Sequence, residues 1–118
     1  MREHSAGGIV NNNEIYVYGG ASLEYEYSSD FWVYDISQQK WAFISDLGWQ
    51  SISGLVGQES TTAHPGGRNR MASAVDNNGN IWLFGGLYKD KNNGETYTRS
   101  DLWRYNTKTK KFTYFDEY

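Results

Sequence analysis

Short apolar and aromatic runs, separated by Asn- and Gly-rich turns, form the dominant pattern of the chain. The clearest run is 80–86, Asn-Ile-Trp-Leu-Phe-Gly-Gly, and a similar run stands earlier at 13–20. In each run apolar residues occupy both alternating faces, which predicts a β-strand that is covered on both sides. A lone four-stranded sheet cannot cover such a strand, so the pattern predicts sheets stacked face to face. It indicates no long helix.

The two runs belong to a repeat that extends over nearly the whole chain. The two Gly-Gly pairs are 66 residues apart, and beyond them the offset becomes 71, which aligns Asp30 with Asp101 and Trp32 with Trp103. One structural unit is therefore used twice. The second copy has a longer connection after its Gly-Gly pair.

Each copy predicts four short strands joined as an antiparallel meander. We expect them at 4–10, 14–19, 31–36 and 40–45 in the first copy, and at 70–76, 80–85, 102–106 and 111–116 in the second. Asn- and Gly-containing turns of the kind that tolerate positive φ join the first strand to the second. The first strands have small residues at their middles, which suits strands crowded near a common axis.

Composition is that of one globular β-domain: 118 residues, 17% aromatic, with thirteen glycines. The absence of cysteine excludes disulfides and thiolate sites and leaves the redox compartment open. No signal segment or membrane-length apolar run is present, which favours the cytoplasm and argues against a membrane partner.

Charge is distributed unevenly between the two copies. The net charge of −3 excludes a strongly basic nucleic-acid footprint, so no nucleic-acid partner is expected. Residues 1–59 carry two bases against eight acids, whereas residues 60–118 carry nine bases against six acids. Drift between repeats explains this simply; alternatively, acidic and basic units attract one another when they meet head to tail.

The ordered set of repeated residues resembles the kelch repeat. An Arg-led strand of small residues is followed by an apolar strand ending in Gly-Gly, an aromatic-rich strand preceded by Asp, and a fourth strand opening with an aromatic residue. Phe112 departs from the usual Trp but keeps an aromatic ring. The repeated residues are Gly19, Gly20, Asp30, Trp32, Tyr34 and Trp41 in the first copy, and Gly85, Gly86, Asp101, Trp103, Tyr105 and Phe112 in the second.

The resemblance implies an all-β fold, a kelch-type β-propeller segment with two four-stranded antiparallel blades. We expect blade 1 at 1–46, a long inter-blade loop at 47–67 and blade 2 at 68–118. Propellers close with four to eight blades, so two blades leave aromatic faces open to water. Either further kelch blades follow in a longer parent chain, or copies assemble head to tail into a ring, for example three copies making six blades.

Loop lengths predict a functional face. The long connections 21–29, 46–67 and 87–99 emerge at one end of the blades, and loops on a rigid scaffold commonly carry function. We therefore expect a non-catalytic protein-protein interaction module that binds a protein or peptide there. The candidate contact residues are Tyr25, Tyr27, Trp49, His64, Tyr88, Lys89, Lys91, Tyr97 and Arg99, with Trp49 and Tyr97 equally suited to anchoring the loops.

Several repeated charged residues favour a structural role. Arg2 and Arg68 open the first strands, where the resemblance implies that they brace neighbouring blades. Asp30 and Asp101 precede the third strands, where a turn-capping carboxylate is expected.

Alternative functions remain open at this stage. One is a carbohydrate-binding propeller; another is a fragment of a kelch-type enzyme whose catalytic residues lie on absent blades. The histidines, His4 and His64, stand at unrelated repeat positions without a catalytic motif, and residues 90–95 fail the ligand spacing of a calcium loop. We therefore expect no catalytic residue, no metal and no cofactor.

Overall fold

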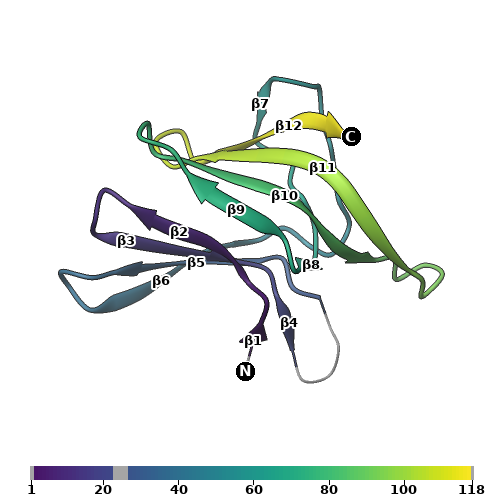
Figure 1. Ribbon diagram of the computed structural model, residues 1–118, viewed down its shortest axis with the longest axis horizontal. Helices are drawn as coiled ribbons and strands as arrows, with labels where there is room; N and C mark the ends of the chain where they lie inside the picture. Colours follow the sequence, from purple (N-terminus) through teal and green to yellow (C-terminus); the bar gives the residue numbers. More distant parts are fainter. Residues whose placement is uncertain (1, 23–26, 118) are drawn as a thin grey trace.

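Two main antiparallel sheets, one from each sequence repeat, make up the fold, together with a separate two-stranded sheet (Figure 1). The computed structural model describes residues 2–22 and 27–117, with only the backbone described at residues 2 and 3. The first sheet has the order β2-β3-β5-β6, formed by Ala6–Val10, Glu14–Tyr18, Asp30–Asp35 and Lys40–Asp46. The second contains β9, β10, β11 and β12, formed by Ala72–Val75, Asn80–Lys89, Thr96–Asn106 and Lys111–Glu117.

Four shorter strands complete the sheets. In the second sheet, β7 (Glu59–Ser60) pairs with β12 at one edge and β8 (Arg68–Asn69) pairs with the far part of β10. Beside the first sheet, β1 (Arg2–Glu3) pairs with β4 (Ala21–Ser22). The β1–β4 pair and the β8–β10 pair are equivalent, because β1 and β8 stand 66 residues apart, as do β2 and β9. The two repeats are therefore two copies of one blade.

The first strand of each blade is broken, which corrects the prediction of continuous strands at 4–10 and 70–76. His4 and Arg70, again 66 residues apart, have φ values of 58° and 60°. A residue in this left-handed region cannot continue an extended strand. The backbone therefore steps sideways between β1 and β2, and between β8 and β9.

The Gly-Gly pairs bend the second strands at equivalent points. Gly19 and Gly20 have φ values of 71° and 102°, and Gly85 and Gly86 have 68° and 95°. A Cβ on Gly19 would lie 2.6 Å from the carbonyl oxygen of Arg68. Both the conformation and the close approach of another backbone require glycine here.

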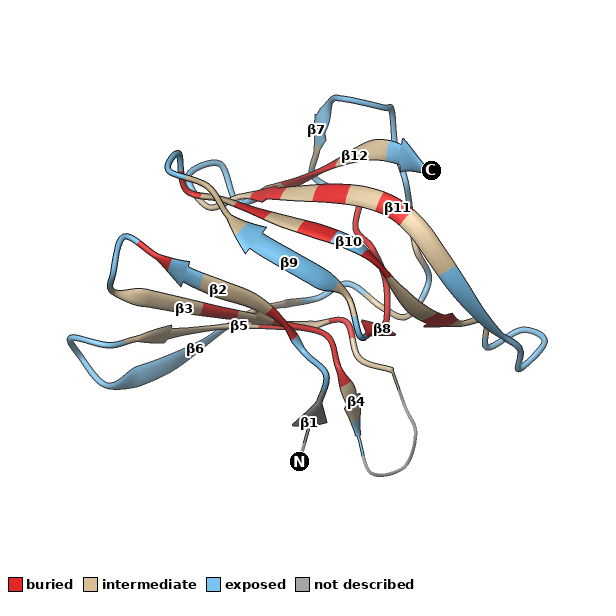
Figure 2. Ribbon diagram, in the orientation of Figure 1, coloured by how far each residue is buried: buried red, intermediate tan, exposed pale blue. Residues whose placement is uncertain are grey.

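The blades pack face to face, and the core lies between them. Figure 2 shows buried residues in the strands of both sheets. Tyr18 and Phe31 of the first blade contact Tyr105 and Phe112 of the second, with a distance of 4.6 Å between the ring centroids of Phe31 and Tyr105. The halves thus form separate stacked sheets, which confirms the prediction of a propeller segment with two blades.

The first strands lie side by side at one edge of this stack. The Ser73 hydroxyl of β9 accepts a hydrogen bond from the Gly7 N–H of β2 at 3.1 Å and donates to the Gly7 carbonyl oxygen at 3.0 Å. A Cβ on Gly8 would lie 2.6 Å from a methyl group of Val75. Small residues therefore permit close approach of these two strands, as expected for strands near a common axis.

The segment 87–99, expected as a loop, is largely a β-hairpin. β10 continues to Lys89 and β11 begins at Thr96, and their pairing includes Tyr88 with Tyr97. Aromatic and β-branched residues favour strands, and cross-strand aromatic pairs stabilise them. The long connection of the second blade is therefore a projecting hairpin, visible at the right of Figure 1. Among the described residues, no helix is long and apolar enough to cross a membrane.

We expect Leu83→Ala to destabilise the chain by about 2–5 kcal/mol, because it opens a cavity in the packed interface. Leu83 is 1% exposed, whereas Leu55, in the inter-blade connection, is 69% exposed. The matched variant Leu55→Ala should change stability by no more than about 0.5 kcal/mol. Urea unfolding of both variants checks this, and equal losses would contradict the packing described.

Candidate functional site

The end of the molecule that carries β4, β8 and the β10–β11 hairpin is the candidate functional site. Figure 1 shows the four tight turns at the opposite end. Those turns are short and similar in the two blades, with positive φ at the equivalent residues Gln39 and Lys110. The connections at the candidate end are longer and differ between the blades, so any specific recognition is favoured there.

Arg68 forms the buried centre of this end. Its side chain is 1% exposed, and its guanidinium forms a two-pronged ion pair with the carboxylate of Asp101, with 2.6 Å between Nη2 and Oδ2. Nε donates to the Pro65 carbonyl oxygen at 2.9 Å, and Nη1 donates to that of Gly85 at 3.2 Å. Arg68 therefore links β11, the bend of β10 and the inter-blade connection.

The backbone of Arg68 joins the two blades. Its carbonyl oxygen accepts a hydrogen bond from the Gly20 N–H at 2.7 Å, and its own N–H donates to the Ser28 carbonyl oxygen at 3.1 Å. The prediction that Arg68 braces neighbouring blades therefore holds for its backbone. Its side chain instead pairs within its own blade.

The carboxylate of Asp101 does not cap a turn, which corrects that expectation. It is fully buried, receives the Arg68 guanidinium, and accepts a hydrogen bond from the Trp103 indole N–H at 2.8 Å. Burial alone would raise the pKa of Asp101, but the hydrogen bonds and charge of Arg68, with the Trp103 indole, bring the pKa below its usual value. The side chain of Arg2, which is equivalent to Arg68 in the sequence repeat, lies outside the described residues.

A layer of aromatic and cationic side chains covers this ion pair. Tyr88 is 8% exposed, with the Trp49 ring centroid 6.2 Å from its own. The guanidinium carbons of Arg68 and Arg99 lie 5.8 and 5.4 Å from the Tyr88 ring centroid, within cation–π range. Arg99 also pairs with Glu117 at the surface. Tyr88 is therefore part of the scaffold and is not available as a contact residue, which corrects the prediction.

His64 is likewise buried, at 2% exposed, and belongs to the inter-blade connection. Its backbone pairs with Ile52 in both directions, and its Nδ1 accepts a hydrogen bond from the Gly66 N–H at 3.1 Å. An accepting Nδ1 requires the neutral ring with its proton on Nε2. Burial lowers the pKa of His64, an effect that Asp46 opposes and Arg68 adds to. The predicted contact role of His64 was therefore wrong.

The tip of the β10–β11 hairpin is exposed but internally hydrogen-bonded. The Asn92 N–H donates to the Asp90 carboxylate and the Glu95 N–H to the Asn93 side-chain oxygen, each at 2.8 Å. The Tyr97 hydroxyl donates to the Glu95 carboxylate and accepts from the Asn93 amide, each at 3.0 Å. Tyr97 is nevertheless 41% exposed. The tip therefore presents a ring and charged groups in a defined arrangement.

The remaining predicted contact residues are spread over this end. Lys91 is exposed at the hairpin tip, and Lys89 is half-buried at the end of β10. Trp49 and Tyr27 are half-buried nearby, where Gly67 donates to the Trp49 carbonyl oxygen at 2.9 Å. Tyr25 lies outside the described residues. The structure thus gathers Trp49, Tyr88 and Arg99 into one cluster, separate from Lys91 and Tyr97 at the tip.

Sequence reasoning missed the direct pairing of Arg68 with Asp101, although it identified each as a repeated residue. Their matched positions, opening the first strand and preceding the third, were the available signal. It also missed Arg104, whose guanidinium carbon lies 5.7 Å from the Trp82 ring centroid and 5.1 Å from that of Phe115. Among the described residues, no three His, Asp or Glu side chains lie close enough together to hold a metal ion.

Comparison with known proteins agrees with the repeat geometry. The sequence profile of the kelch motif matches residues 4–48, which contain the whole first sheet. The first blade is a kelch repeat. The second blade, equivalent to it strand by strand, extends the kelch architecture across the chain.

A solved structure shows the same fold. The structure of YjhT, a kelch-type propeller protein, matches with a TM-score of 0.62 and 24% sequence identity over 97% of this chain. The match covers 27% of the YjhT chain, so the present chain spans about a quarter of that protein. At this identity the likeness shows the propeller fold alone. No protein among the curated sequences matches the chain.

We expect Asp101→Asn to cost about 3–5 kcal/mol of stability, because it leaves the buried Arg68 guanidinium without its counter-charge. Glu117→Gln, which removes the exposed partner of Arg99, should cost less than about 1 kcal/mol. Urea unfolding monitored by tryptophan fluorescence measures both. Similar, small losses would show that the buried pair does not hold this end together.

We expect stability to fall as the pH is lowered from about 7 to about 5, and His64→Gln to reduce that fall. The unfolded chain protonates His64 near its ordinary pKa of about 6.5, whereas the folded chain resists protonation. The stability that neutral His64 contributes is therefore complete above about pH 6.5 and declines below it. Asp101 and Asp46 have lowered pKa values, so their contributions are lost only at more acidic pH.

Urea unfolding at several pH values between these limits measures the slope. The matched variant is His4→Gln, which changes the other histidine, an exposed residue. It should keep the wild-type slope. An unchanged slope in His64→Gln would contradict the neutral, buried state of His64.

Proposed function

We propose that the chain is a non-catalytic interaction segment of a kelch-type propeller, which binds a protein or peptide at the end carrying the long connections. The observation that supports this most directly is the β10–β11 hairpin, which projects from the second blade (Figure 1). Its tip presents Tyr97 and Lys91 on a turn whose own polar groups are already hydrogen-bonded. The tight turns at the opposite end offer no comparable feature.

The physical properties of the tip suit protein recognition. Binding requires surface groups to be ordered, and each flexible side chain that becomes fixed costs about 0.5–1.5 kcal/mol. The hydrogen bonds from Tyr97 to Asn93 and Glu95 reduce that cost, because they position the ring before a partner arrives. Tyr is among the residues that most often dominate binding energy at interfaces.

The burial of the candidate catalytic and stacking groups also supports this proposal over the alternatives. His64 lies within the scaffold with Nδ1 already occupied. A flat platform for a sugar would need several exposed rings together, but Tyr88 is buried and Trp49 is half-buried against it, apart from the exposed Tyr97 at the hairpin tip. Carbohydrate binding is therefore the alternative that a glycan array tests. Catalysis on other blades of a longer protein would require residues outside this chain.

The test is selection of peptides from a displayed random library on the immobilised chain, followed by titration of the selected peptides. We expect Tyr97→Ala to weaken binding at least about tenfold, since central Tyr side chains are common hot spots. Lys91→Ala should weaken binding less and reduce its dependence on salt, because it removes an exposed charge. Lys108→Ala, an exposed lysine in the turn at the opposite end, should leave binding unchanged.

Two results would contradict the proposal. One is a set of selected peptides that bind Tyr97→Ala and Lys91→Ala as tightly as the unaltered chain. The other is binding on a glycan array that is insensitive to salt and is lost in Trp49→Ala, with no peptide binding. The second result would assign carbohydrate recognition to this end.

A further inference from the structure

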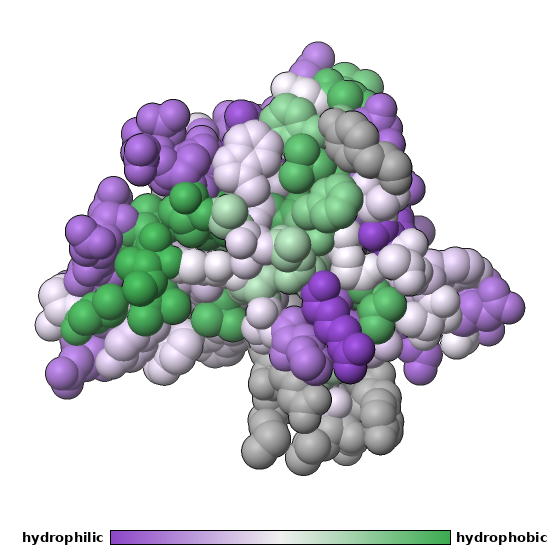
Figure 3. All heavy atoms as spheres, in the orientation of Figure 1, coloured by the Kyte–Doolittle hydropathy of each residue, from purple (hydrophilic) through white to green (hydrophobic). Residues whose placement is uncertain are grey.

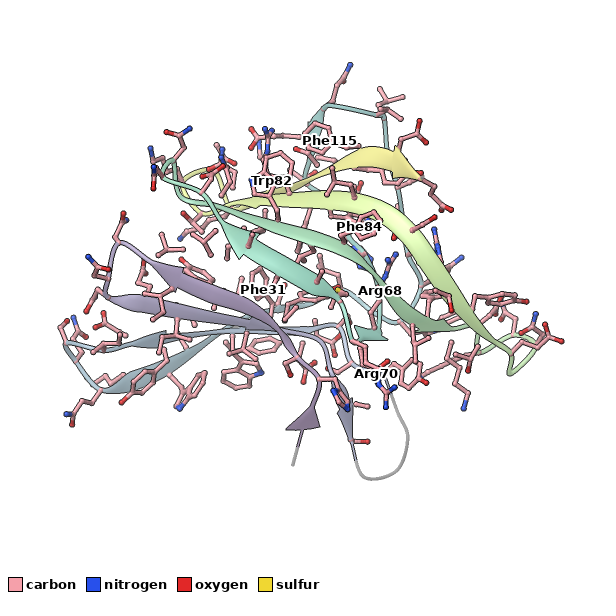
Figure 4. The ribbon with its side chains drawn as sticks, in the orientation of Figure 1. Phe31, Arg68, Arg70, Trp82, Phe84 and Phe115 are labelled. Atoms are coloured by element: carbon pink, nitrogen blue, oxygen red, sulfur yellow. The ribbon has the colours of Figure 1, made fainter. Side chains whose placement is uncertain are left out.

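The outer faces of the two blades form a second surface system, distinct from the hairpin tip. The face of the first blade that is turned away from the second carries Ile15, Val17, Trp32, Tyr34, Trp41 and Phe43, and is called the Trp41 face. The outer face of the second blade carries Trp82, Phe84, Leu102, Arg104 and Phe115, and is called the Trp82 face. Figure 4 shows Trp82, Phe84 and Phe115 on that outer side, with Phe31 between the sheets.

The Trp41 face is open and strongly aromatic. Trp41 and Phe43 are 59% and 52% exposed, and the Trp32 ring centroid lies 5.0 Å from that of Phe43. Together with Ser5 and Val17, Trp32 and Trp41 line an open groove of about 530 Å³. Exposed apolar patches of this kind mark interaction surfaces. Figure 3 shows further apolar side chains over β2, at the left of the view.

The repeat shows what fits the Trp41 face. Its residues are equivalent to the residues of the second blade that pack against the first: Trp32 corresponds to Trp103, and Trp41 to Phe112. Trp103 and Phe112 are only 1% and 3% exposed, and Phe112 contacts Tyr18 and Phe31 of the first blade. In the first blade, by contrast, Trp41 is exposed and Trp32 is only half-buried. The Trp41 face is therefore equivalent to the surface by which the second blade packs on the first, but no blade covers it.

The Trp82 face is equivalent to the surface by which the first blade packs on the second, and it too is uncovered. Trp82 corresponds to Tyr16, and Phe84 to Tyr18, and in the first blade these tyrosines pack against the second blade. Phe84 is 41% exposed, whereas Tyr18 is 2% exposed. The two open faces are thus equivalent to the two surfaces that already meet inside the chain.

Arg104 gives the Trp82 face an additional binding group. The Arg104 guanidinium lies beside the paired rings of Trp82 and Phe115, within cation–π range of both, and its Nη2 reaches the Thr113 hydroxyl at 3.4 Å. Its Nε is buried and has no hydrogen-bond partner. A buried donor without an acceptor is costly, so this side chain is incompletely satisfied within the chain. The net charges of the halves, −6 for residues 1–59 and +3 for residues 60–118, also favour contact between unlike ends.

We propose that the Trp41 face binds the Trp82 face of a second copy of this chain, by repeating the internal blade-to-blade packing. Such an interface joins two different surfaces, so it leaves one open face at each end of a pair and continues until a ring closes. Propellers have four to eight blades, so a closed ring contains about two to four copies. This inference concerns surfaces separate from the hairpin tip and does not depend on the proposed function.

The experiment is sedimentation velocity of the intact chain over a range of concentrations, with variants of each face. We expect a discrete particle whose mass is a small multiple of 13.6 kDa. Trp41→Asp and Phe84→Asp should each weaken self-association at least about thirtyfold, because each places a charge in an apolar interface. Tyr97→Ala, which changes neither face, should assemble like the unaltered chain.

Mixing the two Asp variants tests the head-to-tail geometry. Each variant retains one intact face, so the mixture should form a pair and nothing larger, although each variant alone is monomeric. Circular dichroism establishes that each variant is folded, and Trp41→Gln and Phe84→Gln replace any that is not.

The proposal is overturned if the unaltered, folded chain stays monomeric at its highest soluble concentration. That result would leave the faces for blades of another chain or of a longer parent chain. It is also overturned if Trp41→Asp assembles normally, or if the mixed variants remain monomeric. None of these outcomes alters the peptide-binding test, because Tyr97 and Lys91 lie outside both faces.

Discussion

The buried pair of Arg68 and Asp101 is the interaction on which the rest of the structure depends. A single arginine joins three elements with its side chain and the neighbouring blade with its backbone. An unpaired charge at this depth would be very costly, so Arg68 is compatible with the fold only where Asp101 and the carbonyl oxygens of Pro65 and Gly85 are in place. Local order at the end that carries the long connections and the stacking of the blades therefore depend on each other.

The repeat made most of the fold predictable, because the same pattern of strand and turn residues occurs twice. The Gly-Gly pairs, the aromatic positions and the asparagine turns specified four strands per blade, and alternation in 80–86 specified that both faces of a blade are covered. Where the repeat breaks down, so did the prediction. Residues 87–99 have no counterpart of equal length in the first blade, so their pairing as a hairpin was not visible from the comparison of the two copies.

The candidate site was less predictable, for a physical reason. Position at the loop-bearing end followed from strand order, but exposure depends on which side chains pack on one another across the chain. His64 and Tyr88 look like surface residues in sequence, yet the connection that contains His64 folds down beside Arg68, and Tyr88 covers the ion pair. Tyr97 lies near the tip of the β10–β11 hairpin and stays at the surface, because the hairpin extends beyond the packed sheets.

The broken first strands explain how two blades with different surfaces can share one arrangement. The Arg70 N–H donates to the carbonyl oxygen of His4 at 3.0 Å, so the hydrogen bond joins the backbones of equivalent residues in the two blades. A backbone hydrogen bond between equivalent residues fixes the distance from one blade to the next. It does not depend on which side chains these residues carry. The spacing of the blades is therefore independent of the side chains on their faces. Those side chains can differ between blades, as Val33 and its equivalent Arg104 do, without a change in blade spacing.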